Sequence, residues 1–240
     1  MPSRSPTCTA AWISCGTSSV AKPKLDWLVP ATVSGALVPF AVMAWRLYRH
    51  RLGANPIATA LNQIGLLSLI FLILSLSCTP LKIVFGWNWP LRVRRTLGLC
   101  GFFGAMLHFL VYLGPDQGFN VRELVSDVLK RPFIAVGFSA LVLLVPLALT
   151  STRRSVARLG FARWQRLHRL AYAIGVLAVL HFYLRVKADH TQPILYGLLL
   201  LLGFVLRGVA QIKKSRDQRL RAELRAARPA AGTATSAVSR

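Results

Sequence analysis

The stretch ARWQRLHRLAYAIGVLAVLHFYLRV, residues 162–186, joins a long apolar run to two histidines, His168 and His181. Its apolar part, residues 167–184, is nearly long enough for a helix to cross the hydrocarbon core of a bilayer. A third histidine, His108, lies in the similar stretch AMLHFLVYL. Ionisable side chains are costly at membrane depth, and by default they indicate a functional site. The stretch therefore predicts a transmembrane helix and raises the question of what its imidazoles bind.

The rest of the chain has the composition of a membrane protein. Hydrophobic residues make up 54% of its 240 residues, the mean hydropathy is +0.51, and only seven side chains are acidic. This apolar content exceeds that of a typical soluble domain. We expect an all-α integral membrane protein with a six-helix transmembrane bundle. Its six apolar blocks are residues 27–45, 61–78, 97–113, 133–150, 167–184 and 193–206.

The chain divides into three parts by composition. Residues 1–24 contain no uninterrupted apolar run of the kind that a signal peptide requires, and we expect a disordered cytoplasmic tail there. Residues 25–210 hold all six apolar blocks and form the expected transmembrane domain. Residues 211–240 are first basic and then rich in Ala, Gly, Ser and Thr, which predicts a second cytoplasmic tail with a disordered end.

The distribution of positive charge predicts the orientation in the membrane. The formal net charge is +23, and Lys and Arg number 22 on one side of the expected spans and 8 on the other. By the positive-inside rule, both termini are cytoplasmic. The basic tail then serves as a positive-inside determinant that attracts anionic membrane lipid, and the charge requires no nucleic-acid partner.

Cysteine spacing and sequence motifs exclude other kinds of site. The four cysteines form no CxxC pair, which argues against a disulfide framework and a Cys-ligated zinc site. The sequence contains no GxGxxG or Walker motif for a nucleotide. It also lacks the CxxCH motif that attaches haem covalently.

The predicted orientation gives each histidine a depth. His108 and His181 fall in the outer halves of the third and fifth spans, at the same level, whereas His168 lies at the cytoplasmic end of the fifth. Each imidazole could simply bond a neighbouring helix, or it could bind iron, copper or zinc. Neither span contains a carboxylate, which disfavours a hydrolytic metal site or a proton relay. Haem iron needs only two axial imidazoles from facing helices, so we expect haem between spans three and five.

Two features of these spans leave alternatives open. Small residues could form a slot for the macrocycle or serve close helix packing. They are Gly98, Gly101, Gly104 and Ala105 in the third span and Ala171, Ala173, Gly175 and Ala178 in the fifth. His168 and His181 are 13 residues apart, which allows one haem in each leaflet, but a straight helix would not point both at one partner. A kink or a turn between them would therefore be required.

The third span has no histidine at its inner end to pair with His168. Arg94 stands 14 residues before His108, on nearly the same helix face. It could replace the missing ligand or pair with a haem propionate, and Arg95 is equally placed for the second role.

Several strings between residues 79 and 182 resemble the MsrQ (YedZ) family, within the wider ferric reductase and NADPH oxidase transmembrane superfamily. The resemblance covers about residues 60–207. The strings are TPLKIVFGWNWPLRVRRTLGLCGFFGAMLHFLVYL at 79–113, DVLKRPFIAVGF at 127–138, LALTST at 147–152 and RWQRLHRLAYAIGVLAVLHF at 163–182.

The resemblance implies a multi-pass electron-transfer subunit of the bacterial inner membrane. MsrQ proteins pass electrons from the quinone pool or a cytoplasmic flavin reductase to the periplasmic molybdopterin enzyme MsrP. MsrP reduces methionine sulfoxide and so repairs oxidised periplasmic proteins; the sulfoxide-reducing site is thus expected on the partner. The sequence does not decide whether this chain is itself an enzyme.

The resemblance also implies cofactors and their ligands. His108, His168 and His181 match the family's haem histidines, with one or two haems of type b, and the family is associated with FMN. The superfamily generally has two histidines on each of two helices, whereas the first such helix here has one. Two other functions stay open: a cytochrome b that reduces ferric iron or oxygen, and a non-haem metal transporter or scaffold. The segment GWNWP, residues 86–90, is either an aromatic anchor at the headgroups or a quinone or flavin contact.

Overall fold

The structure is a computed structural model that describes residues 27–227, without the side chains of residues 153, 225 and 227. The expected tail at 1–24 and the end of the second tail, 228–240, lie outside the described residues. The described part is helical throughout. It contains α1 (Leu28–Tyr48), α2 (Pro56–Phe85), α3 (Pro90–Val111), a π-helical turn (Tyr112–Asp116), α4 (Val121–Lys130), α5 (Pro132–Leu149), α6 (Arg153–Leu159), α7 (Phe161–His168), α8 (Leu170–Arg185) and α9 (Thr191–Ala227).

Six stretches of helix within residues 27–227 are long and apolar enough to cross a membrane. The first four are α1, α2, α3 with its π-helical turn, and α5; the fifth joins α7 to α8, and the sixth is most of α9. The prediction of an all-α membrane protein with six spans is therefore confirmed. Apart from α5, these stretches of helix are longer than the predicted apolar blocks, because backbone hydrogen bonding continues past the apolar residues.

Proline, asparagine and glycine set several helix boundaries. The side chain of Asn55 accepts a hydrogen bond from the backbone N–H of Ala58, and Pro56 follows at the first helical position of α2. This is a favoured N-terminus, because proline loses no intrahelical bond there. α2 ends at Gly86, whose φ of 71° is left-handed and costs a glycine little. Pro90 and Pro132 begin α3 and α5 in the same way as Pro56.

Helix α2 lies at the centre of the bundle, in contact with α3, α8 and α9. Three glycines of α3 allow it to approach α2 closely, since a methyl group at each would meet a side chain of α2 within 3.2 Å. These pairs are Gly98 with Ser75, Gly101 with Leu72 and Gly104 with Ser68. For these glycines, close helix packing is the interpretation that the structure supports. A buried cluster of Leu144, Leu147 and Ile174 joins α5 to α8.

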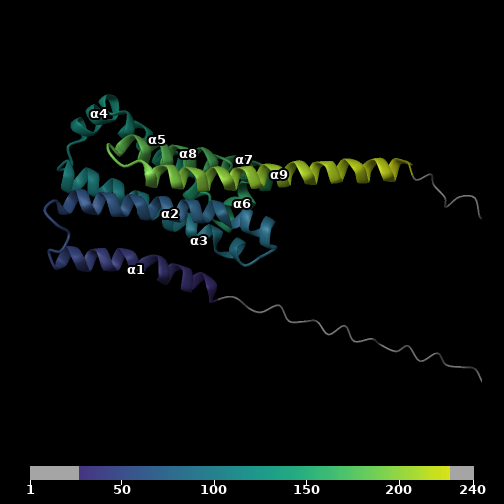
Figure 1. Cartoon of the computed structure of the whole chain (residues 1–240), viewed down its shortest axis with the longest axis horizontal. Coiled ribbons are helices and arrows are strands. Elements are labelled where there is room, and N and C mark those ends of the chain that lie inside the picture. Colours follow the sequence, from purple (N-terminus) through teal and green to yellow (C-terminus); the bar gives the residue numbers. More distant parts are fainter. Residues whose placement is uncertain (1–26, 228–240) are drawn as a thin grey trace, which may run out of the picture.

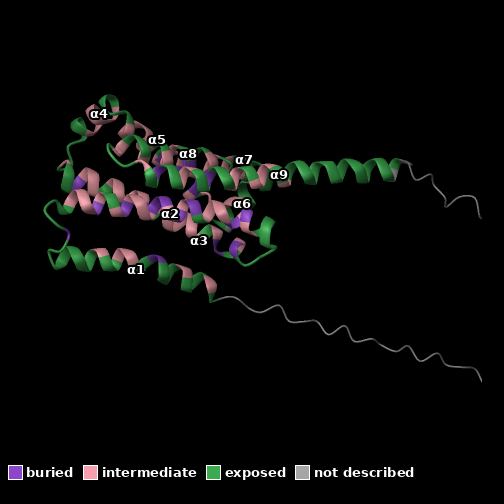
Figure 2. Ribbon diagram, in the orientation of Figure 1, coloured by how far each residue is buried: buried purple, intermediate pink, exposed green. Residues whose placement is uncertain are grey.

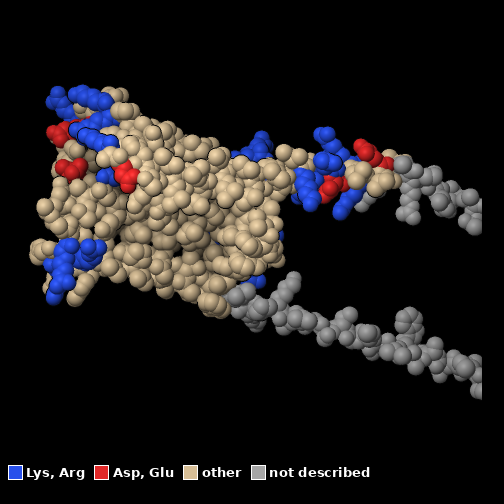
Figure 3. Space-filling model, viewed as in Figure 1, with Lys and Arg blue, Asp and Glu red and all other residues tan. Residues whose placement is uncertain are grey.

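The two ends of the bundle differ. α1 begins and α9 leaves the bundle at one end, here called the tail end, whereas α4 lies at the opposite end, the α4 end (Figure 1). Much of the outer surface of the helices is exposed in Figure 2. Between the two ends, the face in Figure 3 is almost free of charged side chains. Such an uncharged band is typical of a surface in contact with lipid.

Helix α9 extends well beyond the bundle at its C-terminal end (Figure 1). It continues to Ala227, so the described part of the basic segment after residue 210 is helical. Its lipid-facing part exposes Leu198, Leu199, Leu201 and Leu202. Past the bundle, the same helix carries the lysines and arginines that Figure 3 shows in blue.

Candidate functional site

His108 of α3 and His181 of α8 face each other inside the bundle. Their ring centroids are 6.2 Å apart, and the ring planes are inclined by 81°. The two residues are 73 positions apart in the sequence but lie at one level of the membrane domain, as their predicted depths required. The structure thus brings together the two histidines that the sequence analysis assigned to one layer.

A backbone carbonyl from a neighbouring helix holds each of these two rings. The Nδ1 atom of His108 lies 3.0 Å from the carbonyl oxygen of Leu61 in α2, and Nδ1 of His181 lies 2.7 Å from that of Phe133 in α5. A carbonyl oxygen only accepts, so Nδ1 carries the hydrogen and donates in both bonds. In the neutral ring, Nε2 keeps its lone pair and can bind a metal. This arrangement, with one nitrogen held by a carbonyl, is common for histidine ligands.

A glycine makes room for each of these bonds. Gly65 and Gly137 follow Leu61 and Phe133 by four residues, so each carbonyl lies next to a glycine on the helix surface. A Cβ atom at Gly65 would lie 3.0 Å from Cε1 of His108, and one at Gly137 would lie 2.5 Å from Nδ1 of His181. Any larger residue would push the imidazole away from its carbonyl.

The two histidines line one cavity of about 300 Å³ between α2, α3, α5 and α8. Its walls are mainly apolar and include Leu66, Leu69, Phe109, Phe138 and Leu141. Of the small residues singled out in the sequence, Ala105 and Ala178 line it. The volume is within the range of small-molecule sites in proteins, and an apolar wall with a few placed polar groups is typical of them.

These residues fit a haem iron held between two imidazoles. A metal–nitrogen bond of about 2.0 Å and a distance of about 1 Å from nitrogen to ring centre, counted on both sides, give about 6 Å between centroids. The observed 6.2 Å agrees with this. Within residues 27–227, no group of three or more His, Cys, Asp or Glu side chains is placed to hold a metal ion.

His168 lies apart from this pair, at the last position of α7. Its ring stacks on Trp164 at 4.0 Å between centroids, and its Nδ1 lies 3.1 Å from the carbonyl oxygen of the same residue. Trp164 is itself held by α5, because its indole N–H donates to the carbonyl of Thr150 over 3.0 Å. The Nε2 atom of His168 is buried and has no hydrogen-bond partner in the described part of the chain. The structure thus presents a third imidazole with a free nitrogen.

The helix breaks between His168 and His181. α7 ends at His168 and α8 begins at Leu170, with tighter i to i+3 bonds around Arg169. The N–H of Arg169 bonds to Arg166, and the carbonyl of Arg169 accepts from Tyr172. The turn that the 13-residue spacing required is therefore present.

Positive charge gathers near His168 at the tail end. Arg94 of α3 donates to Thr79 of α2 over 3.4 Å and lies close enough to His168 and Arg207 for its charge to act on both. The guanidinium of Arg207 lies 4.9 Å from the ring centre of Tyr172. Its buried Nη1 atom has no hydrogen-bond partner among the described residues. The position of Arg94 near His168 is compatible with either role that the sequence left open.

Comparison with known proteins places the chain in a family. Residues 59–179 match the family described as ferric reductase like transmembrane component. The chain is 47% identical over 191 residues to the protein-methionine-sulfoxide reductase heme-binding subunit MsrQ of Deinococcus radiodurans, which covers 80% of this chain and 92% of that protein. The chain belongs to the MsrQ family. MsrQ of Herminiimonas arsenicoxydans is 46% identical over 187 residues, or 77% of this chain and 86% of that protein.

MsrQ of Rhodospirillum rubrum is similar to the same extent, with 44% identity over 189 residues, or 79% of this chain and 91% of that protein. The family resemblance predicted from the sequence is therefore confirmed. All three relatives are named as heme-binding subunits of a methionine sulfoxide reductase.

Sequence reasoning missed the two glycines that make room for the histidine rings in this chain. It considered small residues only on the two helices that carry histidines, whereas Gly65 and Gly137 lie on the helices that precede them. The sequence signal that could have indicated them is a glycine inside each neighbouring span, in NQIGLL at 62–67 and IAVGFS at 134–139. Close approach of another group is a common reason for glycine inside a membrane helix.

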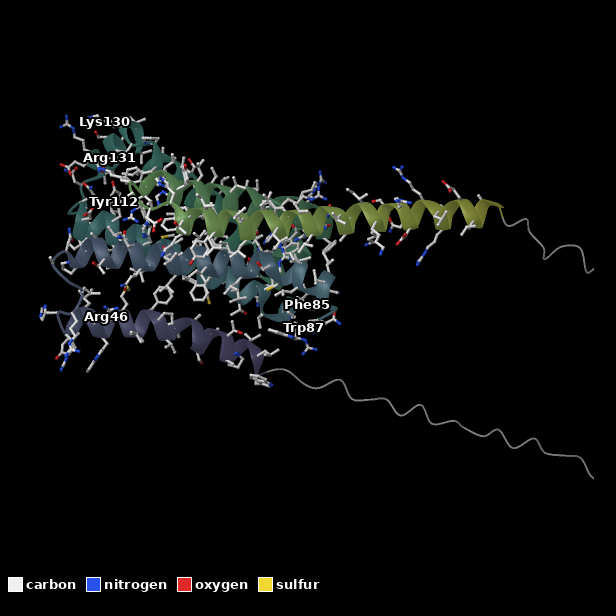
Figure 4. The ribbon with its side chains drawn as sticks, in the orientation of Figure 1. Arg46, Phe85, Trp87, Tyr112, Lys130 and Arg131 are labelled. Carbon is white, nitrogen blue, oxygen red and sulfur yellow. The ribbon has the colours of Figure 1, made fainter. Side chains whose placement is uncertain are left out.

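The aromatic segment GWNWP lies at the tail end of the bundle, between α2 and α3 (Figure 4). Phe85 and Trp87 stack at 5.0 Å between centroids, and Trp87 and Trp89 at 6.2 Å. All three side chains are exposed. Such an exposed aromatic row at the end of two spans is typical of a headgroup anchor.

Proposed function

We propose that this MsrQ-family chain is a haem b electron-transfer subunit in which His108 and His181 hold one haem between spans three and five. The observation that supports this most is the pair of facing imidazoles, each with Nδ1 bonded to a backbone carbonyl and Nε2 free, in one apolar cavity. Haem, when bound, supplies one-electron transfer. If both imidazoles bound the iron, they would leave no room on it for a substrate, which favours electron transfer over reaction of a substrate there.

We further propose that His168 holds a second haem near the tail end. One support is its buried Nε2 atom, which lacks a hydrogen-bond partner in the described part of the chain. Another is the break between α7 and α8, because it allows the ring of His168 to point in a direction that the direction of His181 does not determine. Arg94, on the helix that carries His108, contributes positive charge there, as a ligand or as the partner of a propionate. FMN enters the proposal through the family resemblance alone, and no described residue is assigned to it.

The proposed orientation follows from the uneven distribution of Lys and Arg. With 22 of these residues on the side of the termini and 8 on the other, the tail end is cytoplasmic and the α4 end periplasmic in a bacterial inner membrane. The route of electrons then runs from a quinone or a cytoplasmic flavin reductase to the molybdoenzyme MsrP in the periplasm. The reduction of methionine sulfoxide takes place on MsrP, and this chain supplies its electrons.

The test is the absorption spectrum of the full chain purified in detergent. We expect a Soret band, and acid acetone should extract the pigment because the chain has no covalent attachment motif. His181→Ala should lose absorbance, whereas His190→Ala, a histidine outside the cavity, should keep it. A colourless wild-type protein from haem-replete cells would support a scaffold or transporter instead.

A further inference from the structure

Arg185 lies one helical turn after His181 on α8 and lines the same cavity. Tyr112, the first residue of the π-helical turn that continues α3, likewise follows His108 by four residues and also lines the cavity. Tyr112 lies at the α4 end of the molecule, together with Lys130 and Arg131 (Figure 4). Both helices therefore present, one turn beyond the histidine, a polar side chain at the α4 end of the cavity.

The two arginines that line the cavity differ in their partners. Arg131 forms an ion pair with Asp127 over 3.1 Å, whereas no carboxylate among residues 27–227 lies within 4.0 Å of a side-chain nitrogen of Arg185. Asp127 also accepts hydrogen bonds from Tyr112 over 2.7 Å and from Gln117 over 3.4 Å. With three donors already on it, this carboxylate is not available to Arg185. Asp116 also lines the cavity but forms no ion pair with Arg185. Arg185 is thus a partly buried cation that lines the cavity with no carboxylate of the described residues in contact with it.

An unpaired guanidinium within a membrane domain is costly, because its charge is partly removed from water. A carboxylate is the group that matches its planar fork, through two parallel hydrogen bonds. Haem b carries two carboxylates, its propionates, on one edge of an otherwise apolar ring. The cavity therefore offers a complementary set: mainly apolar walls, two imidazoles and, at the α4 end, the guanidinium of Arg185 with no carboxylate of the described residues in contact with it.

We propose that Arg185 binds a propionate of the haem that His108 and His181 hold, and so orients the propionate edge toward the α4 end. This inference rests on the proposed function, since it requires haem in that cavity. Arg185 would then act as a binding residue for the cofactor rather than as a ligand of the iron. The positive charge of Arg185 also stabilises the reduced haem relative to the oxidised haem. Removal of this charge should therefore lower the midpoint potential.

The experiment combines a change in the protein with a change in the ligand. The full chain, produced in haem-deficient cells and purified in detergent, is titrated with haem and with haem dimethyl ester, whose carboxylates are blocked. In the wild type, esterification should weaken binding about 10-fold or more, the size expected for a charge-assisted hydrogen bond. In Arg185→Gln, esterification should weaken haem binding by less than about threefold, because the guanidinium that binds the carboxylate is gone.

Arg131→Gln is the matched control, because Arg131 lines the same cavity but already pairs with Asp127. It should keep the full effect of esterification. An equal loss on esterification in the wild type and in Arg185→Gln would overturn the inference while leaving haem binding intact. If the wild type fails to bind haem with a two-imidazole spectrum, the proposed function itself fails, and this inference fails with it.

A second variant covers the case in which Arg185→Gln does not fold. Arg185→Lys keeps the positive charge but loses the planar fork. It should retain haem and shift the propionate-bending band in the resonance Raman spectrum relative to the wild type. An unchanged band would show that no propionate contacts this side chain, and would overturn the inference.

Discussion

The imidazole of His181 lies directly over Gly137 of the neighbouring helix, so that a Cβ atom there would be 2.5 Å from its Nδ1. The carbonyl that this Nδ1 bonds, that of Phe133, belongs to the same helix one turn earlier. His108 has the same relation to Gly65 and Leu61. The same local arrangement, a carbonyl followed four residues later by a glycine, thus positions both histidine rings at the cavity.

We predict that Gly137→Ala lowers the haem content of the purified protein at the site of His181, because the methyl group displaces the ring from its carbonyl. The haem that remains should show an altered ligand-field spectrum at low temperature. Gly197→Ala is the control, since a Cβ atom there would meet Val179 at an ordinary 3.5 Å. Equal haem content and identical spectra in both variants would show that the fit at Gly137 is not needed.

Asp127 fixes the α4 end of the domain, and its substitution should loosen that end. In Asp127→Asn, the negative charge that Arg131 pairs with is gone and the bonds from Tyr112 and Gln117 weaken. We expect a loss of about 1–3 kcal/mol in the free energy of local opening. Faster proteolysis of the segment 112–131 in proteoliposomes measures it.

Glu123→Gln is the control for Asp127, because Glu123 lies on the same helix, is exposed and forms no ion pair within the described residues. It should be cleaved at the wild-type rate. If both variants are cleaved at the same rate as the wild type, the cluster around Asp127 does not hold α4.

The sequence was sufficient for the fold and for the pairing of two histidines. Long apolar blocks fix the number of spans, because a helix is the simplest structure that satisfies backbone hydrogen bonds in lipid. Charge asymmetry then orders the histidines by depth, and the structure places His108 and His181 together as that order required. The sequence also predicted a kink or a turn between His168 and His181, because a straight helix would not point both imidazoles at one neighbouring helix.

Side-chain neighbours could not be predicted in the same way. Which helix face packs against α3 or α8 depends on packing in three dimensions. The sequence therefore did not predict that Gly65 and Gly137 lie against the histidine rings, or that Arg185 lines the cavity without an ion pair to a described residue. The glycines of α3 were candidates for a cofactor slot, but the structure packs Gly101 and Gly104 against α2 instead. Periodicity alone does not separate these two uses.

His168→Ala should spare the haem of the other two histidines and remove the haem proposed near the tail end. The remaining haem should also be reduced more slowly by a reductant supplied from the tail end in proteoliposomes. Haem content and the reduction rate are measured on the same preparation. If His168→Ala keeps the full haem content and the wild-type rate, His168 holds no haem and serves only to pack against Trp164 within α7.

Orientation can be tested independently of any cofactor. A reporter that is active only in the periplasm, fused after residue 210, should remain inactive, because the positive-inside rule places that segment in the cytoplasm. The same reporter inserted in the α4 segment after residue 120 should be active. The reverse pattern would exchange the two ends and the direction of electron flow.

The haem content of His108→Ala, His181→Ala and the double variant tests the central claim most directly. If one haem binds between the two imidazoles, each single variant should lose the same spectral component. The double variant should lose little more, as expected for residues that act as one unit. Loss of different components in the two single variants, with additive loss in the double variant, would contradict a shared haem between His108 and His181.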